Sequence, residues 1–380
     1  MNRRLWLASQ KASLERKRKL RSFYAKPHKK LKAGKKYTIP RHSGVVKKFV
    51  SIAIRNKLPK YRPEIILQQF FARCVVDTSP DMGILGDPSK FSIAADGTPF
   101  YSGASHYGIK VCDCKSKGIY DCKCPRRYSD PNATWGWDSY REQWFYGDTL
   151  FVTTASDSHN DLPIYLRKAQ AQRHDSIIAV FALDEVRKLY PKVCFKNYIA
   201  DGAMDNYPTY KLLQHYSMIP FIPLDSAASY PDKNLPIGVF GFDDHGNPLC
   251  QGFIPYENCG YSYPKGIKHK CWFDYHGLEK PCNCSDSPYG RTIYIKPDYD
   301  PRLFPPVSRD SEAFKKMLKR RTTVERSHKR MFKDYDIEAG NCRSARERFT
   351  RATMSAVNVH LDAWIKHTRF SVISLIEGLA

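Results

Sequence analysis

The chain has 380 residues, 42% of them hydrophobic and 13% aromatic, which is enough apolar material for two or three folded domains and excludes a mainly disordered protein. The formal net charge is +24, and residues 1–60 hold 20 Lys and Arg against the single acid Glu15, so we expect a partner with many phosphates. No apolar stretch approaches the ~18 residues that span a bilayer, and no signal-peptide core follows the basic N-terminus, so we expect a cytoplasmic, nucleoid-associated protein without a membrane partner.

The N-terminal part is expected to be basic and helical. We predict a basic, partly disordered arm over residues 1–45 that either contacts DNA or is merely solvated. Residues 46–90 are predicted to be a helical region that binds DNA or leads into the core. Apolar residues recur there at helical spacing, and Pro59 and Pro63 separate two helices.

Residues 91–227 have the pattern of the first part of an α/β core. The segment 91–100 is expected to contain a short first strand whose end places Asp96 beside a turn at Gly97. Strands are then expected at 144–154, 162–166, 193–200 and 219–224, with helices at 176–189, capped by Ser176, and 207–216. The strand at 193–200 ends at Asp201, where ligand sites of α/β sheets collect. Residues 228–310 are rich in Gly, Pro, Cys and Tyr and are predicted to be a β-rich insertion.

Residues 311–380 are predicted to be helical, with a charged helix first and an amphipathic helix at 346–367 last. Within 320–333, Glu325 is the one acid among six Lys and Arg residues and a His. Helical spacing would place on one face, about one turn apart, Arg321, Glu325, Lys329 and Lys333. Such a face either holds a divalent metal against a phosphodiester or is an i,i+4 salt-bridge ladder on a solvated helix.

Three acids are candidates for metal ligands: Asp96, Asp201 and Glu325. Two-metal phosphoryl transfer needs a few carboxylates that hold Mg²⁺ ions ~4 Å apart, with water and phosphate as the remaining ligands. The alternative for an Asp-Gly pair after a strand is an ordinary turn. Asp138, which lies before another strand, is the alternative first acid, and Asp205 is the alternative to Asp201.

The segments around these acids resemble the DDE transposases of prokaryotic insertion sequences. The matching segments are ADGT at 95–98, YIADGAMD at 198–205 and RTTVER at 321–326, in the order of that family, with a β-rich insertion before the last one. The resemblance covers roughly residues 90–367. It implies an α/β fold with an RNase H-like mixed-sheet core, a β-rich insertion, and helical N- and C-terminal flanks.

The resemblance also implies a reaction. Asp96, Asp201 and Glu325 would be the catalytic residues and would bind Mg²⁺ or Mn²⁺. Water would attack the phosphate at the element's end, and the freed 3′-OH would attack target DNA. Double-stranded DNA, as element ends and target, would be the partner of a homodimer. The cations that would grip phosphates are Arg321, Arg326, Lys329 and Lys333, although Leu318 stands where the family has a Tyr.

Cysteines suggest a second metal. Cys112, Cys114, Cys122 and Cys124 form two close pairs that could hold a structural Zn²⁺, although each pair encloses one residue where two or more are usual. Five further cysteines between residues 250 and 284 could form another site. Reduced, structurally idle thiols are the alternative for both groups. Two other functions remain open from the sequence: a non-catalytic, zinc-stabilised nucleic-acid-binding protein, and a host nuclease with an RNase H-like core.

Overall fold

The computed structural model describes residues 24–25, 42–59, 62–124, 126–225, 230, 234–279, 281, 284–338 and 342–368. Most of the basic arm expected over 1–45 lies outside these residues, as does Cys282. No helix among the described residues is both long and apolar enough to cross a bilayer.

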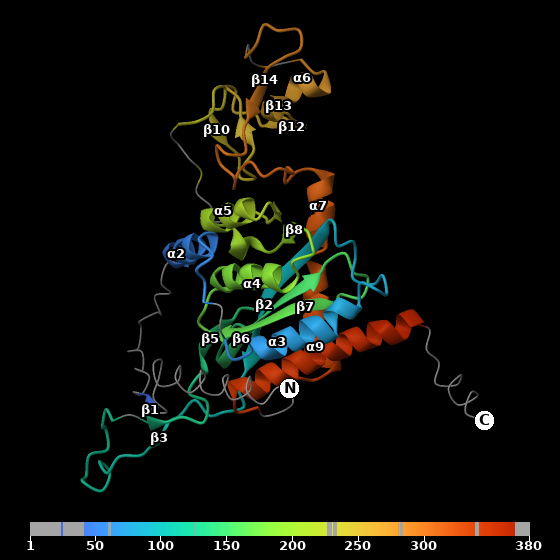
Figure 1. The fold of residues 1–380 in the computed structure, drawn as a ribbon. Helices are drawn as coiled ribbons and strands as arrows, with labels where there is room; N and C mark the ends of the chain where they lie inside the picture. Colours follow the sequence, from blue (N-terminus) through green and yellow to red (C-terminus); the bar gives the residue numbers. More distant parts are fainter. Residues whose placement is uncertain are drawn as a thin grey trace, which may run out of the picture.

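A mixed six-stranded sheet forms the centre of the molecule (Figure 1). Its strands are β2 (Phe91–Tyr101), β5 (Thr134–Asp138), β6 (Gln143–Ala155), β7 (Pro163–Gln170), β8 (Phe195–Ile199) and β9 (Ile219–Phe221). Their order is β5-β6-β2-β8-β9, and β7 also pairs with β6. β6 is antiparallel to β2, β5 and β7, whereas β8 and β9 run parallel to β2. The predicted α/β class is therefore confirmed.

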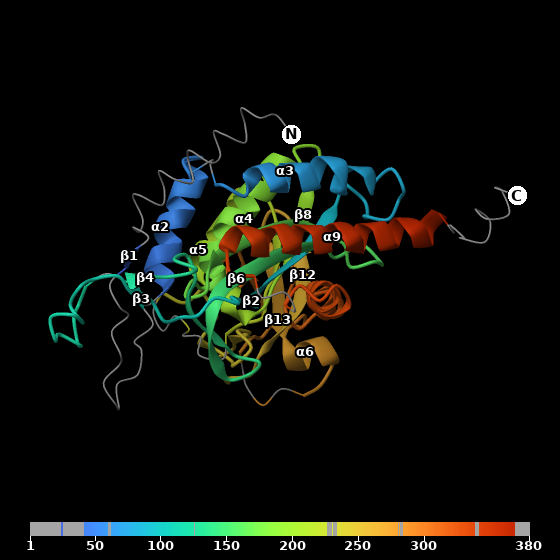
Figure 2. The same cartoon turned by 90° about the horizontal axis from the view of Figure 1, so that it is seen from below.

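Helices cover both faces of the sheet (Figures 1 and 2). On one face lie α4 (Asp175–Leu189) and α5 (Tyr207–His215), with α2 (His42–Ile54) packed on both. The other face carries α8 (Thr322–Lys329) and α9 (Ala345–Thr368), and α3 (Ile65–Cys74) packs beside α9 and β7, preceding the short turn η1 (Val76–Thr78). The two predicted N-terminal helices are thus present, and their apolar faces belong to the main core.

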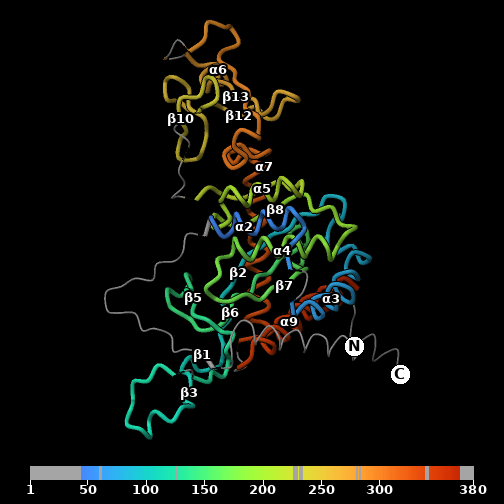
Figure 3. The backbone as a smooth tube through the Cα atoms, turned by 60° about the vertical axis from the view of Figure 1, so that its left-hand side comes forward, coloured from blue at the N-terminus to red at the C-terminus, as the bar shows by residue number. Residues whose placement is uncertain are grey.

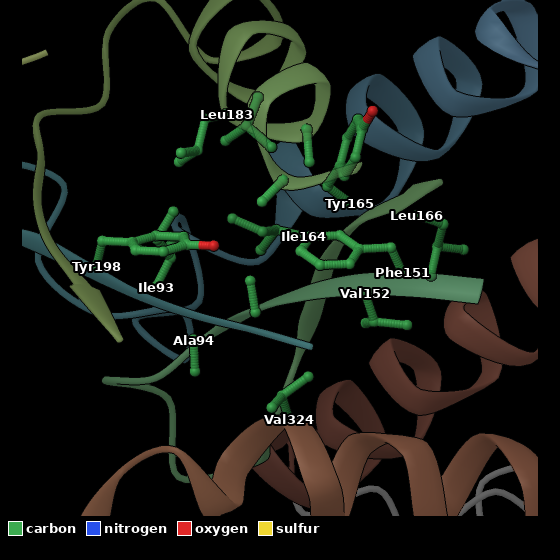
Figure 4. Packing of buried hydrophobic residues seen from close by; sticks show 14 of the residues in the cluster. Ile93, Ala94, Phe151, Val152, Ile164, Tyr165, Leu166, Leu183, Tyr198 and Val324 are labelled. Carbon is green, nitrogen blue, oxygen red and sulfur yellow. The ribbon is translucent and has the colours of Figure 1, made fainter. Parts of the chain in front are cut away.

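Packing of alternate strand residues fixes which face each side chain occupies. Figure 4 shows Ile93 and Tyr198 pointing to the side of the sheet on which Leu183 of α4 lies. Ala94 points to the other side, towards Val324 of α8, and all five side chains are buried. Because the side-chain period of a strand is two, Asp96 lies on the same face as Ala94, under α8.

Three local expectations were wrong. β2 does not end at Asp96 but continues to Tyr101, because β6 pairs with it without interruption as far as Gly147. The N-cap of α4 is His174, whose side chain accepts a hydrogen bond from the backbone N–H of Ser176. The charged helix is divided into α7 (Glu312–Lys319), α8 and a π-helical segment, η3 (Arg330–Asp334).

The described residues of the predicted insertion, from 234 onward, have their own small core and project from one end of the molecule (Figure 3). Its elements are β10 (Gly241–Phe242), β11 (Pro248–Leu249), β12 (Tyr256–Ser262), β13 (Gly266–Cys271), α6 (Trp272–His276) and β14 (Thr292–Ile295). The strands expected in this region are therefore present. Arg302 connects the insertion to the segment that follows β8, because its guanidinium forms a two-pronged ion pair with Asp205.

A second projection leaves the opposite end of the molecule (Figures 1 and 3). Residues 104–124 and 126–128, which we call the cysteine ribbon, contain β3 (Ile109–Lys110) and β4 (Arg126–Arg127). Their strands form a small sheet with β1 (Tyr24–Ala25) in the order β1-β4-β3. At the base of the ribbon, the ring of His106 packs edge-on against Trp135 of β5 at a centroid distance of 4.9 Å.

A buried cation joins α9 to the sheet. Arg348 is fully buried, and its Nη1 donates to Asp130 at 2.6 Å. The same guanidinium binds Asp148 of β6 through Nε, at 3.1 Å, and Nη2. Both carboxylates are buried as well. Removing one partner from such a group leaves an uncompensated buried charge, at a cost of roughly 3–5 kcal/mol.

Candidate active site

Asp96 lies in the middle of β2. Up to Ala94 this strand pairs with both β6 and β8, and beyond it β2 pairs with β6. On one side it is paired with Val152 of β6. On the other side the parallel pairing with β8 ends two residues earlier, at Ala94 and Ile199. The carboxylate is half-buried, and its Oδ1 accepts a hydrogen bond of 2.8 Å from the Gly97 N–H. Asp96 is therefore held in place just beyond the point where the pairing of β2 with β8 ends.

Asp201 lies two residues beyond the last residue of β8, Ile199, which pairs with Ala94, itself two residues before Asp96. The charge of Asp201 acts on Asp96. Asp201 caps the short 3₁₀-helix η2 (Gly202–Met204) by accepting a hydrogen bond from the Ala203 N–H at 3.1 Å. The sequence placed Asp201 correctly at the end of its strand.

Glu325 lies on α8, which packs on β2 and β6. The helix is fixed by its neighbours: Val324 is fully buried, and the hydroxyl of Thr323 lies 3.3 Å from that of Thr154 on β6. The Glu325 side chain is 44% exposed and forms an i,i+4 ion pair of 2.7 Å with Arg321. Its charge affects both aspartates, so the structure brings all three predicted acids within electrostatic reach of one another.

The electrostatics of the two aspartates favour a cation. Burial, followed by the charge of Asp201, raises the pKa of Asp96 to about 7, while the Gly97 N–H and Arg321 oppose the shift. Burial also raises the pKa of Asp201, although the Ala203 N–H and Arg321 lower it. Carboxylates that are costly to ionise together are stabilised by a divalent cation, and oxygen ligands of this kind are those that Mg²⁺ prefers. The chemistry of these donors therefore fits Mg²⁺ or Mn²⁺, although the ligand oxygens of Asp96, Asp201 and Glu325 do not all lie within 4.8 Å of one another in this structure.

A fourth acid, Asp175, was missed by the sequence analysis. It is the first residue of α4 and lies below Gly97, on the opposite face of β2 from Asp96. A Cβ atom on Gly97 would lie under 3.0 Å from both carboxylate oxygens of Asp175, so this position requires glycine. Burial, followed by the charges of Asp96 and Asp201, raises the pKa of Asp175 well above its usual value. The only sequence signal was an acid in the first turn of the helix after the third strand.

The two alternative acids are occupied elsewhere. Asp138 ends β5, which β6 separates from β2, and its carboxylate accepts hydrogen bonds from the Tyr101 hydroxyl at 2.9 Å and from two backbone N–H groups. Asp205 binds Arg302 through both oxygens and also accepts from the Tyr210 hydroxyl at 2.9 Å. Both acids therefore stabilise local structure with most of their hydrogen-bonding capacity, unlike Asp96.

The predicted cations lie in different surroundings. Lys329 is exposed on α8, one turn beyond Glu325. Lys333 is also exposed but lies in η3, where the wider π-helical turn rotates it away from the row expected for an uninterrupted α-helix. Arg326 forms a two-pronged ion pair with Asp161, at 2.7 and 2.8 Å. Of the four cations, Arg321 and Lys329 are the ones that flank Glu325 along the helix.

The four cysteines of the ribbon converge. All four sulfurs lie within 4.8 Å of one another, and the pairs Cys112–Cys122 and Cys114–Cys124 are each separated by 3.5 Å. A tetrahedral zinc with Zn–S bonds of ~2.3 Å requires sulfurs about 3.8 Å apart, whereas a disulfide requires about 2.0 Å. The spacing therefore fits zinc ligands. In the described part of the chain no other such group is found, and the insertion's Cys282 lies outside it.

The acidity of these thiols agrees with this geometry. A hydrogen bond from the Cys114 backbone, followed by the contact with Cys122, lowers the pKa of Cys112 to about 7. Contacts with Cys124 and then Cys112 raise the pKa of the Cys114 thiol to about 12. One sulfur thus ionises easily and the next does so only with difficulty. A divalent cation removes that difficulty, because it neutralises the crowded thiolates.

Comparison with known proteins identifies the family. The family model of the transposase DDE domain matches residues 94–359, a span that includes the three acids, the cysteine ribbon and the insertion. No curated protein matches the chain significantly, and neither does any solved structure.

Proposed function

This chain belongs to the transposase family with a DDE domain, and from that premise we propose that it cleaves the ends of an insertion-sequence element and joins them to target DNA in a metal-dependent reaction. The observation that carries the proposal is that the charges of Asp201 and Glu325 both act on Asp96, although the three acids come from segments far apart in the chain. We assign these three acids as the catalytic and metal-binding residues.

The family implies a divalent metal, and we propose Mg²⁺ or Mn²⁺ at these carboxylates. When bound, such ions activate the attacking oxygen and stabilise the leaving oxygen. The chain itself positions the ligands. Asp96 is fixed by the strand, Asp201 by its capping hydrogen bond, and Glu325 by its ion pair with Arg321. Lys329, exposed one turn further along, is suited to contact a phosphate of the DNA.

We propose an RNase H-like core for this fold. The first acid lies in the first strand of the sheet, and the second acid follows the first of the two parallel strands beyond it, in agreement with the resemblance. By the same proposal, residues 46–90 lead into a core formed by 91–227, the insertion is 228–310, and 311–380 return the last acid to the core. The partner would be double-stranded DNA, bound by a homodimer at the nucleoid.

We also propose that the four ribbon cysteines hold one structural Zn²⁺. The support is their spacing, which matches a tetrahedral tetrathiolate site more closely than a pair of disulfides. Measurement of metal content after reduction and dialysis tests this. One zinc per chain is expected, and a ratio near zero would contradict the proposal.

The catalytic assignment is tested by Glu325→Gln, which removes one negative charge and keeps the shape of the side chain. We expect DNA cleavage to be lost while DNA binding persists, because the substituted residue contacts the metal rather than the duplex. The matched control is Glu312→Gln on α7, whose side chain is 89% exposed. Normal cleavage by the Glu325→Gln variant would refute the assignment.

Strand transfer needs its own assay, because a host nuclease with the same core would also cleave. The protein is incubated with duplexes from the DNA that flanks its reading frame and with a target plasmid. Joined products are expected from a transposase. Hydrolysis products alone, across several end sequences, would identify a nuclease, and no reaction in the presence of tight binding would favour a non-catalytic DNA-binding protein.

A further inference from the structure

The cysteine ribbon presents a group of exposed cations. It contains six Lys and Arg residues and two Asp residues, so its balance stays positive even after the two negative charges of a tetrathiolate zinc centre. Lys115, Lys117, Lys123 and Arg127 are exposed. Within the described residues none of these four forms an ion pair with a carboxylate, whereas Lys110 donates to the Tyr120 carbonyl of the ribbon itself.

The shape of the ribbon suits contact with a large partner. Figures 1 and 3 show that it extends beyond the sheet at the end opposite to the insertion. Its strands are tightly paired at the base: a Cβ on Gly108 would lie 2.6 Å from the Cβ of Arg126. Beyond this base the four cysteines bring the two arms together. A bound zinc would therefore hold the lysines of both arms in one fixed arrangement.

The ribbon exposes both apolar and cationic side chains, and each kind suits a different partner. Ile109, Val111 and Ile119 are 46–55% exposed, which by itself would suit a protein surface. However, Lys115 and Lys117 lie between Val111 and Ile119 in the sequence. A protein interface over this segment would have to desolvate their ammonium groups, which is costly. The family's substrate supplies phosphates in the required number. The exposed rings of Tyr107 and Tyr120 add surfaces that can pack against sugars.

We propose that the cysteine ribbon is a second DNA-binding surface, which grips the phosphate backbone of double-stranded DNA through Lys115, Lys117, Lys123 and Arg127. The proposal deepens the proposed transposase function and rests on its DNA substrate. It is separable from the catalytic assignment, because none of these residues belongs to the carboxylate site. The ribbon contributes affinity, and the carboxylates contribute cleavage.

The test compares DNA binding at several salt concentrations. The variant Lys115→Ala, Lys117→Ala, Lys123→Ala is measured with a 40-base-pair duplex, and its zinc content is determined alongside. Each lost phosphate contact reduces the slope of log K against log salt by about 0.9, so the triple variant should lose about 2–3 from the slope and bind about tenfold or more weakly at 0.1 M salt. The matched control replaces three exposed lysines of the core: Lys192, Lys196 and Lys211.

The measured slopes and zinc contents show whether the ribbon binds DNA. A shallower slope with full zinc content, and an unchanged slope for the control, supports the ribbon as a DNA-binding surface. An unchanged slope for the ribbon variant, or a changed oligomeric state without DNA, overturns it. Cys112→Ser with Cys122→Ser should lose both zinc and the same part of the slope. Because Glu325→Gln should keep the full slope and lose cleavage, failure of the ribbon proposal and failure of the catalytic assignment are distinguishable.

Discussion

Replacing Asp96 by Asn removes the carboxylate that is costly to ionise and keeps its shape. The amide oxygen of Asn can accept the hydrogen bond that Gly97 N–H now donates to Asp96. In the folded protein, burial and the charge of Asp201 raise the pKa of Asp96 from 3.8 to about 7. In the unfolded chain the carboxyl ionises near its ordinary value. Between the two values, the metal-free folded state therefore binds more protons than the unfolded state.

The sign of the effect follows from this difference in bound protons. The free energy of unfolding falls as the pH rises from about 4 to about 7, and the full cost is present above pH 7. One pKa unit corresponds to ~1.4 kcal/mol, so ionising Asp96 costs on the order of 4 kcal/mol of stability at pH 8. The Asn variant avoids this cost. It should therefore be more stable than the parent protein by an amount of that order at pH 8, and equally stable at pH 4.

The assay is thermal unfolding in EDTA at pH 5 and pH 8, repeated with Mg²⁺. We expect Asp96→Asn to raise the Tm at pH 8 by several degrees and much less at pH 5. Mg²⁺ should raise the Tm of the parent protein and have little effect on the variant. Glu312→Gln, at an exposed carboxylate, should show neither effect. A variant that unfolds at or below the parent's temperature at pH 8 would refute the placement of the half-buried Asp96 beside another acid.

Three further predictions concern the framework. Gly97→Ala should lower stability by about 1–3 kcal/mol in denaturant unfolding, because the new Cβ overlaps Asp175, whereas Gly44→Ala, in open space on α2, should not destabilise. Arg348→Ala should cost about 3–5 kcal/mol by the same measurement, because two buried carboxylates lose their partner; Arg351→Ala, exposed on the same helix, should cost little. Chelation should make the cysteine ribbon the first site of limited proteolysis; an unchanged cleavage pattern would contradict a structural metal there.

Much of the sheet followed from local pattern. Runs of apolar residues predicted β6 and β8, which the structure buries, and Asp201 was correctly expected just after the end of β8. The family resemblance, borne on three short segments, was confirmed by the match over residues 94–359. In both cases the decisive information lies within a few neighbouring residues. The periodicity of helices and strands, and short motifs, depend on residues that are close together in the sequence.

The features that the sequence did not predict depend on contacts between distant segments. Asp96 and Gly97 form a common turn pair, but β6, whose residues lie some 55 positions later, extends the strand through them. Asp175 is important because it lies against Gly97 on another element, and no local pattern indicates that approach. The π-helical end of the charged helix is likewise a property of packing, since Met331 and Phe332 are buried there. Contacts between distant segments decided each of these.

The burial of Arg348 has a consequence for damaged copies of the gene. A reading frame interrupted before α9 would yield a chain in which Asp130 and Asp148 have lost both their guanidinium and the helix that carries it. Such a product should fail to fold rather than persist as a subunit that occupies DNA without cutting it. A mobile element with this architecture would lose activity through truncation without producing an inhibitor of its intact copies.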